Sequence, residues 1–136
     1  MEIRIRGAIP SDINFIYATW LRSYRYGSTT GRSVQNTIFF PEYNKVIDNL
    51  LSKSTVLVAC LDTDNEVIFG YLVYEANTIH YCFIKESFRG LGIMNKLITS
   101  LIFKYHTHET YLGEGLIKKY HLIYNPFLLY QRGLNG

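Results

Sequence analysis

Residues 79–98 constrain the fold most, because an apolar run passes through a glycine pair directly into an amphipathic run. The apolar run is "IHYCFIK" (79–85), and its β-branched and aromatic content is typical of a buried strand. The linking segment "ESFRGLG" ends at Gly92, and "GIMNKLITSLIFKYH" (92–106) has the apolar spacing of a helix. These residues therefore predict a strand, a tight turn and a helix in direct succession.

The glycine turn has two interpretations. A helix amino terminus exposes unpaired N–H groups and the positive end of the helix dipole, so Gly90 and Gly92 beside Arg89 would suit a pyrophosphate. Alternatively, the two glycines serve only a turn that needs positive φ. The segment is no nucleotide P-loop, since no "GK[ST]" follows, and it lacks the third glycine of the dinucleotide fingerprint.

The remainder of the chain predicts a mixed order of strands and helices. Periodicity and turn residues predict a strand at 2–9, a helix from Ser11 or Asp12, a loop at 25–40, a helix from Pro41, a hairpin at 55–76, a strand at 120–124 and a short helix after Asn125. Residues 106–119 give no clear signal. The order favours an α/β or α+β fold with a mostly antiparallel sheet, in one domain that spans 1–136.

Composition excludes several functional classes. The formal net charge of +3 is too weak to argue for nucleic acid, and the apolar runs are far shorter than a membrane span. The amino terminus is no signal peptide. Cys60 and Cys82 lie in apolar runs and read as free thiols, which favours a reducing, cytoplasmic location, although a disulfide stays open. No spacing of ligands predicts a metal site.

The segment "IKESFRGLGIMNKLI" resembles the acetyl-coenzyme A motif of the GNAT (GCN5-related N-acetyltransferase) superfamily. The matching positions are Ile84, Phe88, Arg89, Gly90, Gly92, Ile93, Leu97 and Ile98. The later segment "YNPFLLYQRGL" is similar to the family's carboxy-terminal segment through Asn125, Tyr130, Gly133 and Leu134. The element order matches the family over most of the chain.

This resemblance implies a central sheet that is splayed between strands four and five and flanked by about four helices. Acetyl-coenzyme A would enter the gap, with its pantetheine paired to the fourth strand and its pyrophosphate on the N–H groups of residues 89–94. The implied cofactor-binding residues are Cys82, Phe83, Ile84, Arg89, Gly90, Leu91, Gly92, Ile93, Met94 and Asn125. Met94 departs from the small residue usual there, so its side chain either narrows the phosphate site or points away.

Acetyl transfer to an amine needs a base for the amine and a proton for the leaving thiolate. By the resemblance, Tyr130 is the expected acid. His80 is the expected base, because its ordinary pKa near 6.5 suits proton removal and it shares a strand face with Cys82 and Ile84. Alternatively, Tyr130 is only a packing residue and His80 is only hydrogen-bonded within or beside the sheet. In that case Glu75 or ordered water would take the proton from the amine. Cys82 is not expected to carry the acyl group.

The acceptor is expected on the first pair of helices and the loop between them, through Tyr24, Arg25 and Tyr26, together with the more distant Tyr74 and Tyr111. The loop contains Arg25 and Arg32 but no acidic residue, which disfavours a strongly cationic acceptor. A primary amine of a small molecule or of a protein stays open as the acceptor. GNAT proteins often dimerise, so the resemblance also implies that a homodimer is compatible with this chain.

The sequence supports a second function of a different class. A GNAT-like domain that has lost catalysis would act as a protein-binding module, and Met94, the compressed carboxy-terminal segment and the abundant tyrosines favour it. Nucleic-acid binding ranks third, with only the mild positive charge behind it.

Overall fold

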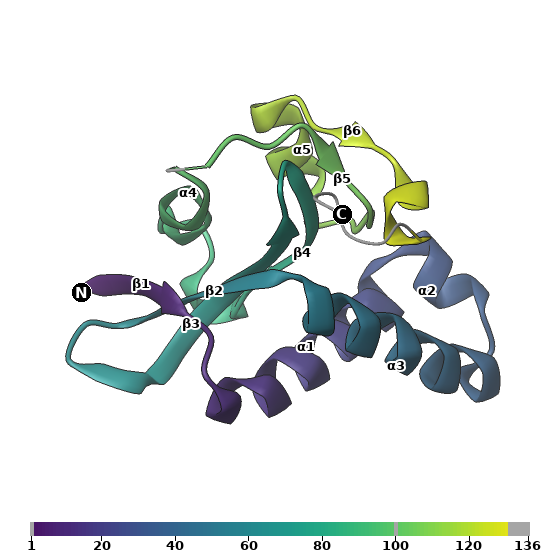
Figure 1. Cartoon of the computed structure of the whole chain (residues 1–136), viewed down its shortest axis with the longest axis horizontal. Coiled ribbons are helices and arrows are strands. Elements are labelled where there is room, and N and C mark those ends of the chain that lie inside the picture. Colours follow the sequence, from purple (N-terminus) through teal and green to yellow (C-terminus); the bar gives the residue numbers. More distant parts are fainter. Residues whose placement is uncertain (1, 100, 131–136) are drawn as a thin grey trace.

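The computed structural model describes residues 2–99 and 101–130, which form one sheet with helices on both faces (Figure 1). The strands, in sheet order, are β1 (Ile3–Gly7), β2 (Thr55–Leu61), β3 (Asp64–Glu75), β4 (Thr78–Ile84), β5 (Tyr105–His106) and β6 (Ile123–Tyr124). The described α-helices are α1 (Ile13–Gly27), α2 (Thr29–Ser33), α3 (Asn36–Lys53), α4 (Ile93–Ile98) and α5 (Glu114–Tyr120). Strands β1 to β4 pair antiparallel, whereas β4–β5 and β5–β6 are parallel. The predicted mixed, mostly antiparallel fold is confirmed.

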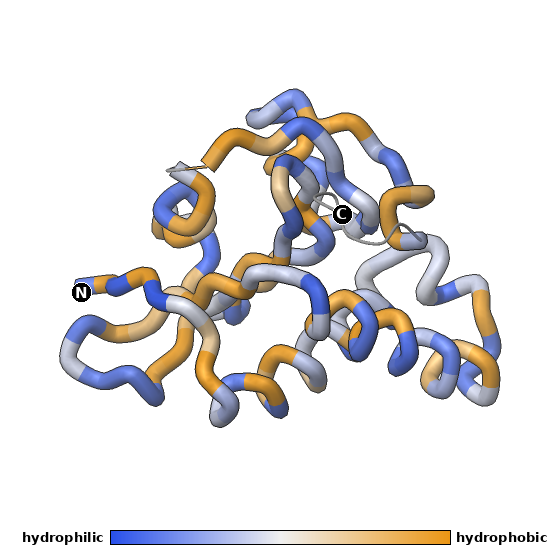
Figure 2. Tube along the Cα trace, in the orientation of Figure 1, coloured by the Kyte–Doolittle hydropathy of each residue, from blue (hydrophilic) through white to orange (hydrophobic). Residues whose placement is uncertain are grey.

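Each face of the sheet has its own apolar core, because successive strand residues point to opposite faces. Helices α1 and α3 cover one face, where Trp20, Ile47 and Tyr71 are fully buried. Helices α4 and α5 cover the other face, where Leu72 and Leu97 are buried. The turn between β2 and β3 is hydrophilic, whereas the strands that cross the centre of the molecule are largely hydrophobic (Figure 2).

Strands β4 and β5 stay together over a very short distance. Thr78 pairs with Tyr105 and Ile79 with His106, and the Thr107 N–H donates to the Ile79 carbonyl at 3.1 Å. The remaining half of β4 does not pair with β5 and lines a pocket instead. This divergence lies where the resemblance implies a splay between strands four and five.

The expected loop at 25–40 is wrong, because most of it is helical. Helix α1 runs on to Gly27, and Ser28 caps α2 by accepting the N–H of Gly31 at 2.8 Å. Helix α3 begins at Asn36, so Pro41 lies inside this helix and not at its start. The first turn of α3, ahead of Pro41, is held in place because Phe39 packs into the core beside α1.

The helix expected over 92–106 is also too long. Helix α4 ends at Ile98, and Leu101 and Phe103 then turn inward while Ile102 between them is 90% exposed. This alternation is that of an extended segment, which leads into β5. The strand expected at 120–124 shrinks to the two residues of β6, and α5 occupies the unassigned segment before it.

Candidate active site

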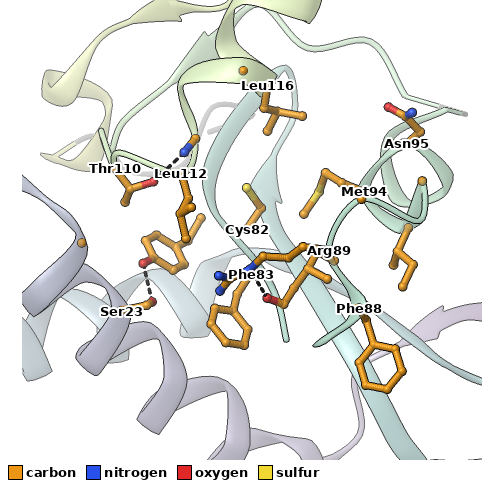
Figure 3. Close-up of a pocket in the computed structure, with 18 residues that line it drawn as sticks. Ser23, Cys82, Phe83, Phe88, Arg89, Met94, Asn95, Thr110, Leu112 and Leu116 are labelled. Carbon is orange, nitrogen blue, oxygen red and sulfur yellow. Dashed lines mark hydrogen bonds between the residues drawn. The ribbon is translucent and has the colours of Figure 1, made fainter. Parts of the chain in front are cut away.

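A pocket of about 570 Å³ opens between the end of β4, the glycine turn and the segment before α5 (Figure 3). Its volume is that of a typical small-molecule site. The lining residues are Ser23, Gly27, Tyr81, Cys82, Phe83, Ile84, Phe88, Arg89, Gly90, Gly92, Ile93, Met94, Asn95, Thr110, Leu112, Gly113, Gly115 and Leu116. Eight of the ten predicted cofactor-binding residues are among them.

The glycine turn forms one end of this pocket. Gly90 and Gly92 have φ of +79° and +78°, a region that residues with a side chain rarely adopt. No heavy atom lies within 4 Å of where a β-carbon would sit at either glycine, so both face open space. The two glycines are therefore consistent with both interpretations. The turn needs residues that adopt positive φ, and the open space beside them leaves room for a ligand.

The free edge of β4 forms the long wall of the pocket. The Lys85 N–H donates to the Phe69 carbonyl of β3 at 2.8 Å, and antiparallel pairing alternates, so the polar backbone groups of Cys82 and Ile84 face away from β3. The Arg89 Nε confirms this direction by donating to the Ile84 carbonyl at 2.9 Å. This edge offers hydrogen bonds to an extended ligand.

The end opposite the glycine turn carries hydroxyl groups. Ser23 Oγ and the Tyr81 hydroxyl lie 2.5 Å apart, joined by the dashed line at Ser23 in Figure 3, and Thr110 lies nearby on the wall. Burial raises the pKa of Tyr81, which keeps its phenol protonated. The geometry is thus a long apolar slot with a glycine turn at one end and hydroxyls at the other.

Comparison with solved structures identifies the architecture. A ribosomal-protein-alanine N-acetyltransferase from Brucella melitensis biovar Abortus 2308 superimposes with a TM-score of 0.56 at 18% identity, over 92% of this chain and 91% of that one. A GCN5-related N-acetyltransferase from Rhodopseudomonas palustris gives 0.51 at 16% identity, over 74% of this chain. The chain has the GNAT fold. It spans 63% of the length of the Rhodopseudomonas protein, just under two thirds.

A third GNAT-fold neighbour is AAC(6')-Iy in complex with the bisubstrate analogue CoA-S-monomethyl-acetylneamine. Its TM-score is 0.51 at 10% identity, over 90% of this chain and 92% of that one. No family model and no curated protein matches the sequence. At these identities the neighbours establish the fold, and function must be argued from the site.

The segment 110–116 is the part of this GNAT-fold pocket that the sequence did not reveal. It supplies Thr110, Leu112, Gly113, Gly115 and Leu116 to the wall opposite β4. Its position depends on long-range bonds, such as the Tyr111 N–H to the Gly27 carbonyl at 2.9 Å. Local periodicity carries no signal for such a bond, so the sequence did not place this segment at the pocket.

Met94 and Asn95 belong to the first turn of α4 and shape the glycine end. The Met94 side chain points into the pocket toward Cys82 (Figure 3). Asn95 Oδ1 accepts from Lys119 Nζ at 2.9 Å and from the Tyr120 hydroxyl at 2.7 Å, which ties α4 to α5. The Met94 side chain thus lies in the pocket on the side of Cys82, while the space beside Gly90 and Gly92 stays open, so its effect on a phosphate stays a prediction.

His80 lies behind the pocket and not on its wall. Its side chain is fully buried, with Nε2 2.7 Å from Glu75 Oε1 and Nδ1 2.9 Å from Thr107 Oγ1. Burial lowers the pKa of His80, partly offset by Glu75, so the imidazole is neutral. His80 thus matches the alternative of a histidine that is hydrogen-bonded beside the sheet. Because its side chain is buried behind the wall, it has no direct contact with an acceptor amine in the pocket.

The other predicted residues are scattered. Tyr130 is 83% exposed and Leu91 58% exposed, and neither lines the pocket. Asn125 Oδ1 accepts the N–H of Phe127 and so begins the last described turn. Gly133 and Leu134 lie outside the described residues. The role of Tyr130 as the acid stays a prediction.

Tyr24, Tyr26 and Tyr74, three of the tyrosines expected to bind the acceptor, lie apart from one another and from the pocket wall. Tyr24 stacks on Tyr43 in the core with ring centroids 4.7 Å apart. Tyr26 is 54% exposed on α1, and Tyr74 packs edge-on against Phe103 on the opposite face of the sheet. Their role in binding stays a prediction that no contact with the pocket supports.

Further features bear on cofactors and location. Cys60 and Cys82 are both unpaired, and burial raises the pKa of the Cys82 thiol to about 12. Within residues 2–99 and 101–130, no three His, Cys, Asp or Glu side chains gather as a metal site. Every helix in the same ranges is too short or too polar to cross a bilayer.

Proposed function

We propose that this chain is an N-acetyltransferase that moves an acetyl group from acetyl-coenzyme A to a primary amine of a small molecule or a protein. The observation that carries the proposal is the pocket between the diverging β4 and the 110–116 segment, with the glycine turn at its end. The GNAT fold of the chain and the coenzyme A portion of the analogue bound by one neighbour support it. The two unpaired cysteines suit a cytoplasmic location.

The residues present fit coenzyme A. The open space beside Gly90 and Gly92 admits a pyrophosphate, and the first turn of α4 supplies unpaired N–H groups. The edge groups of Cys82 and the N–H of Ile84 suit the pantetheine amides, as in β-strand addition, whereas the Ile84 carbonyl already accepts from Arg89. Arg89 adds positive charge at the turn. A cofactor laid in this direction places its thioester at the Ser23 end of the pocket.

Transfer is proposed to be direct. The raised pKa of Cys82 keeps its sulfur a neutral thiol, which is a poor nucleophile, so this cysteine does not carry the acyl group. Ser23 and Tyr81 place a linked pair of hydroxyls at the acyl end. We assign this pair to hydrogen bonding with the reacting centre, beside Tyr130 as the sequence-based candidate for the acid.

The acceptor is proposed to enter from a second hollow of about 390 Å³, which meets the pocket at Thr110. Glu109, Glu114 and Lys118 line this hollow together with Tyr111. Two carboxylates against one ammonium suit an amine that arrives protonated, which reverses the sequence-based argument against a cationic acceptor. That argument considered only the 25–40 segment, whereas the carboxylates come from a segment far along the chain.

Thermal unfolding with and without acetyl-coenzyme A tests the proposal, with a nucleotide of equal charge as the control. A ligand at 100 times its Kd stabilises the native state by roughly 2.7 kcal/mol, a shift of several degrees in a chain of this size. A shift with acetyl-coenzyme A alone, followed by transfer of radiolabelled acetyl to a panel of mono- and diamines, is the expected result. Absence of any shift at millimolar ligand would contradict the proposal.

A catalytically silent, protein-binding domain is the second candidate, and the position of Met94 favours it. Its side chain projects into the pocket toward Cys82, where it narrows the space for an extended ligand. Coenzyme A binding without transfer to any amine or protein would support this candidate over the enzyme.

A further inference from the structure

The pocket contains no group that could take a proton from an amine directly. Among its described lining residues there is no carboxylate and no imidazole, and its ionisable members are Arg89, Cys82 and Tyr81. Cys82 and Tyr81 keep their protons near neutral pH, because burial raises the pKa of both groups, and a guanidinium has no acceptor atom. The lining of the pocket itself therefore offers no base for the reaction.

A small hollow behind the wall leads to such groups. Its volume is about 30 Å³, enough for one water molecule, and it is lined by His80, His106 and His108. The residues that it shares with the pocket are Tyr81, Cys82, Thr110, Gly113 and Leu116. One water in this hollow would therefore lie between the pocket wall and the imidazoles.

The imidazoles belong to one buried chain of hydrogen bonds. Glu75 Oε1 lies 2.7 Å from His80 Nε2, and His80 Nδ1 lies 2.9 Å from Thr107 Oγ1. The same Thr107 oxygen lies 2.9 Å from Nδ1 of His108. Lys53 Nζ lies 3.7 Å from Glu75 and completes the chain at its far end.

The chain has one consistent proton arrangement, assigned from the inventory of donors and acceptors. As the ion-pair partner of Lys53, the Glu75 carboxylate only accepts, so His80 donates from Nε2. Neutral His80 then accepts at Nδ1 from the Thr107 hydroxyl. The Thr107 oxygen in turn accepts from Nδ1–H of His108, which leaves Nε2 of His108 as a bare lone pair.

That lone pair has no partner. His108 is 8% exposed, and its Nε2 is a buried atom without a hydrogen bond. The rings of Trp20, Tyr24, Tyr43 and Tyr81 surround it edge-on, at centroid distances of 5.0 to 5.9 Å. The titratable groups that face it are Tyr24 from α1, Tyr43 from α3, His80 and Tyr81 from β4 and His106 from β5. A buried acceptor without a donor is costly, so its retention points to a use.

We propose that His108 accepts the amine proton through one water and passes it along Thr107 and His80 to Glu75, a step that rests on the proposed acetyl transfer. An acceptor that arrives as an ammonium first loses one proton to solvent, which frees the lone pair of its nitrogen. As the neutral amine nitrogen then bonds to the acyl carbon, one of its N–H bonds breaks and a proton moves through the water to His108 Nε2. His108 Nδ1–H then gives a proton to Thr107, the Thr107 hydroxyl gives one to His80 Nδ1, and His80 Nε2–H gives one to Glu75. The electron pair of the C–S bond leaves with the thiolate, and reverse transfer later returns the proton to the pocket.

No imidazolium forms in this scheme, because each ring gains a proton on one nitrogen as it loses one from the other. That property matters because burial, with the neighbouring His80 and His106, lowers the pKa of His108 to about 3. A histidine that had to hold the positive charge would be a poor base at neutral pH. A histidine that exchanges tautomers avoids that cost.

The proton arrangement is tested first on the free protein by two-dimensional ¹⁵N–¹H NMR of the imidazoles, which requires no activity. The expected result is Nδ1–H with bare Nε2 for His108, and Nε2–H for His80, at pH 7. Nε2–H or an imidazolium at His108 would overturn the relay whether or not the protein transfers acetyl groups. The NMR result can therefore refute the relay even if the proposed acetyl transfer is correct, and the reverse is also true.

Thr107→Val then breaks the relay while it keeps both histidines and the side-chain shape. We expect kcat to fall about 100-fold at pH 7 and to climb with pH as hydroxide replaces the relay, with KM for acetyl-coenzyme A unchanged. Thr107→Ser restores the hydroxyl and should restore the wild-type pH profile. Thr19→Val, which removes a hydroxyl that is bonded to Tyr71 and does not belong to the relay, is the matched control. A folded Thr107→Val enzyme with the wild-type kcat and pH profile would overturn the proposal.

Discussion

Arg89 Nε donates a hydrogen bond to the carbonyl oxygen of Ile84 at 2.9 Å, which joins the glycine turn to the end of β4. The same guanidinium lies 5.9 Å from the ring centroid of Phe83. The two contacts hold the turn against the strand that it follows. The acceptor that Arg89 uses is one of the edge groups that an extended ligand would otherwise reach.

Arg89→Lys separates the charge of this residue from its geometry. Lysine keeps the positive charge but lacks the planar donor, so we expect coenzyme A affinity to fall about 5- to 10-fold by calorimetry. Arg89→Met removes both contributions and should fall further. Arg22→Met, on α1 and outside the pocket lining, is the control. Equal affinities for the lysine variant and the wild type would show that charge alone matters.

Gly90→Ala and Gly92→Ala test the backbone requirement. Positive φ with open space around the β-carbon predicts a loss of about 1 kcal/mol in the free energy of unfolding for each, from backbone strain alone. Gly7→Ala also meets no neighbour and has no positive φ, so it should change stability little. Urea unfolding measures all three, and equal effects at Gly7 and Gly92 would refute the backbone explanation.

Met94→Ala tests whether this side chain restricts the pocket. Its removal enlarges the glycine end, so we expect tighter binding of coenzyme A together with a small loss of stability from the half-buried side chain. Met94→Leu nearly keeps the volume and should bind as the wild type does. Weaker binding by the alanine variant would mean that Met94 packs against the ligand.

His108 makes stability depend on pH in a defined direction. Its pKa is about 3 when folded and near 6.5 when unfolded, so the unfolded chain binds the extra proton between these values. Stability attributable to neutral His108 is complete above pH 6.5 and is lost as pH falls toward 3, at up to about 1.4 kcal/mol per pH unit. Urea unfolding from pH 4 to 7 should show a shallower slope for His108→Gln. Parallel slopes would contradict the assignment.

Glu109→Gln and Glu114→Gln test the acceptor hollow. Each removes one negative charge beside Thr110, so KM for a diamine should rise several-fold at low salt while kcat stays unchanged. Glu42→Gln, an exposed carboxylate paired with Lys45 on α3, is the matched control. Unaltered KM in both hollow variants would place the acceptor elsewhere.

The sequence predicted the elements that are determined by residues close together along the chain. The pattern at 79–98 placed β4, the turn and the start of α4, and the resemblance through Arg89, Gly90 and Gly92 pointed to one end of the pocket. Each of these features arises within about 20 consecutive residues. Periodicity and turn chemistry are sufficient there, because neighbours in sequence are neighbours in space.

The rest of the site depends on residues that are distant in sequence. Ser23 meets Tyr81, and Thr107 meets His80, only after the chain has folded back across the sheet. His80 was found by its residue type, but its burial was not, because a strand pattern does not say which elements will cover a face. The burial of His108 is likewise invisible in the sequence, because the four aromatic rings that enclose it come from α1, α3 and β4.

The early parting of β4 from β5 leaves a sheet edge inside the molecule. An edge with free backbone groups is a template for other strands, and open sheets usually shield theirs with charge, bulges or cover. Here a small molecule that lies along Cys82 and Ile84 would act as the missing strand. Cellular supply of that molecule would then govern how often the edge is bare, and with it the chain's exposure to aggregation and proteolysis.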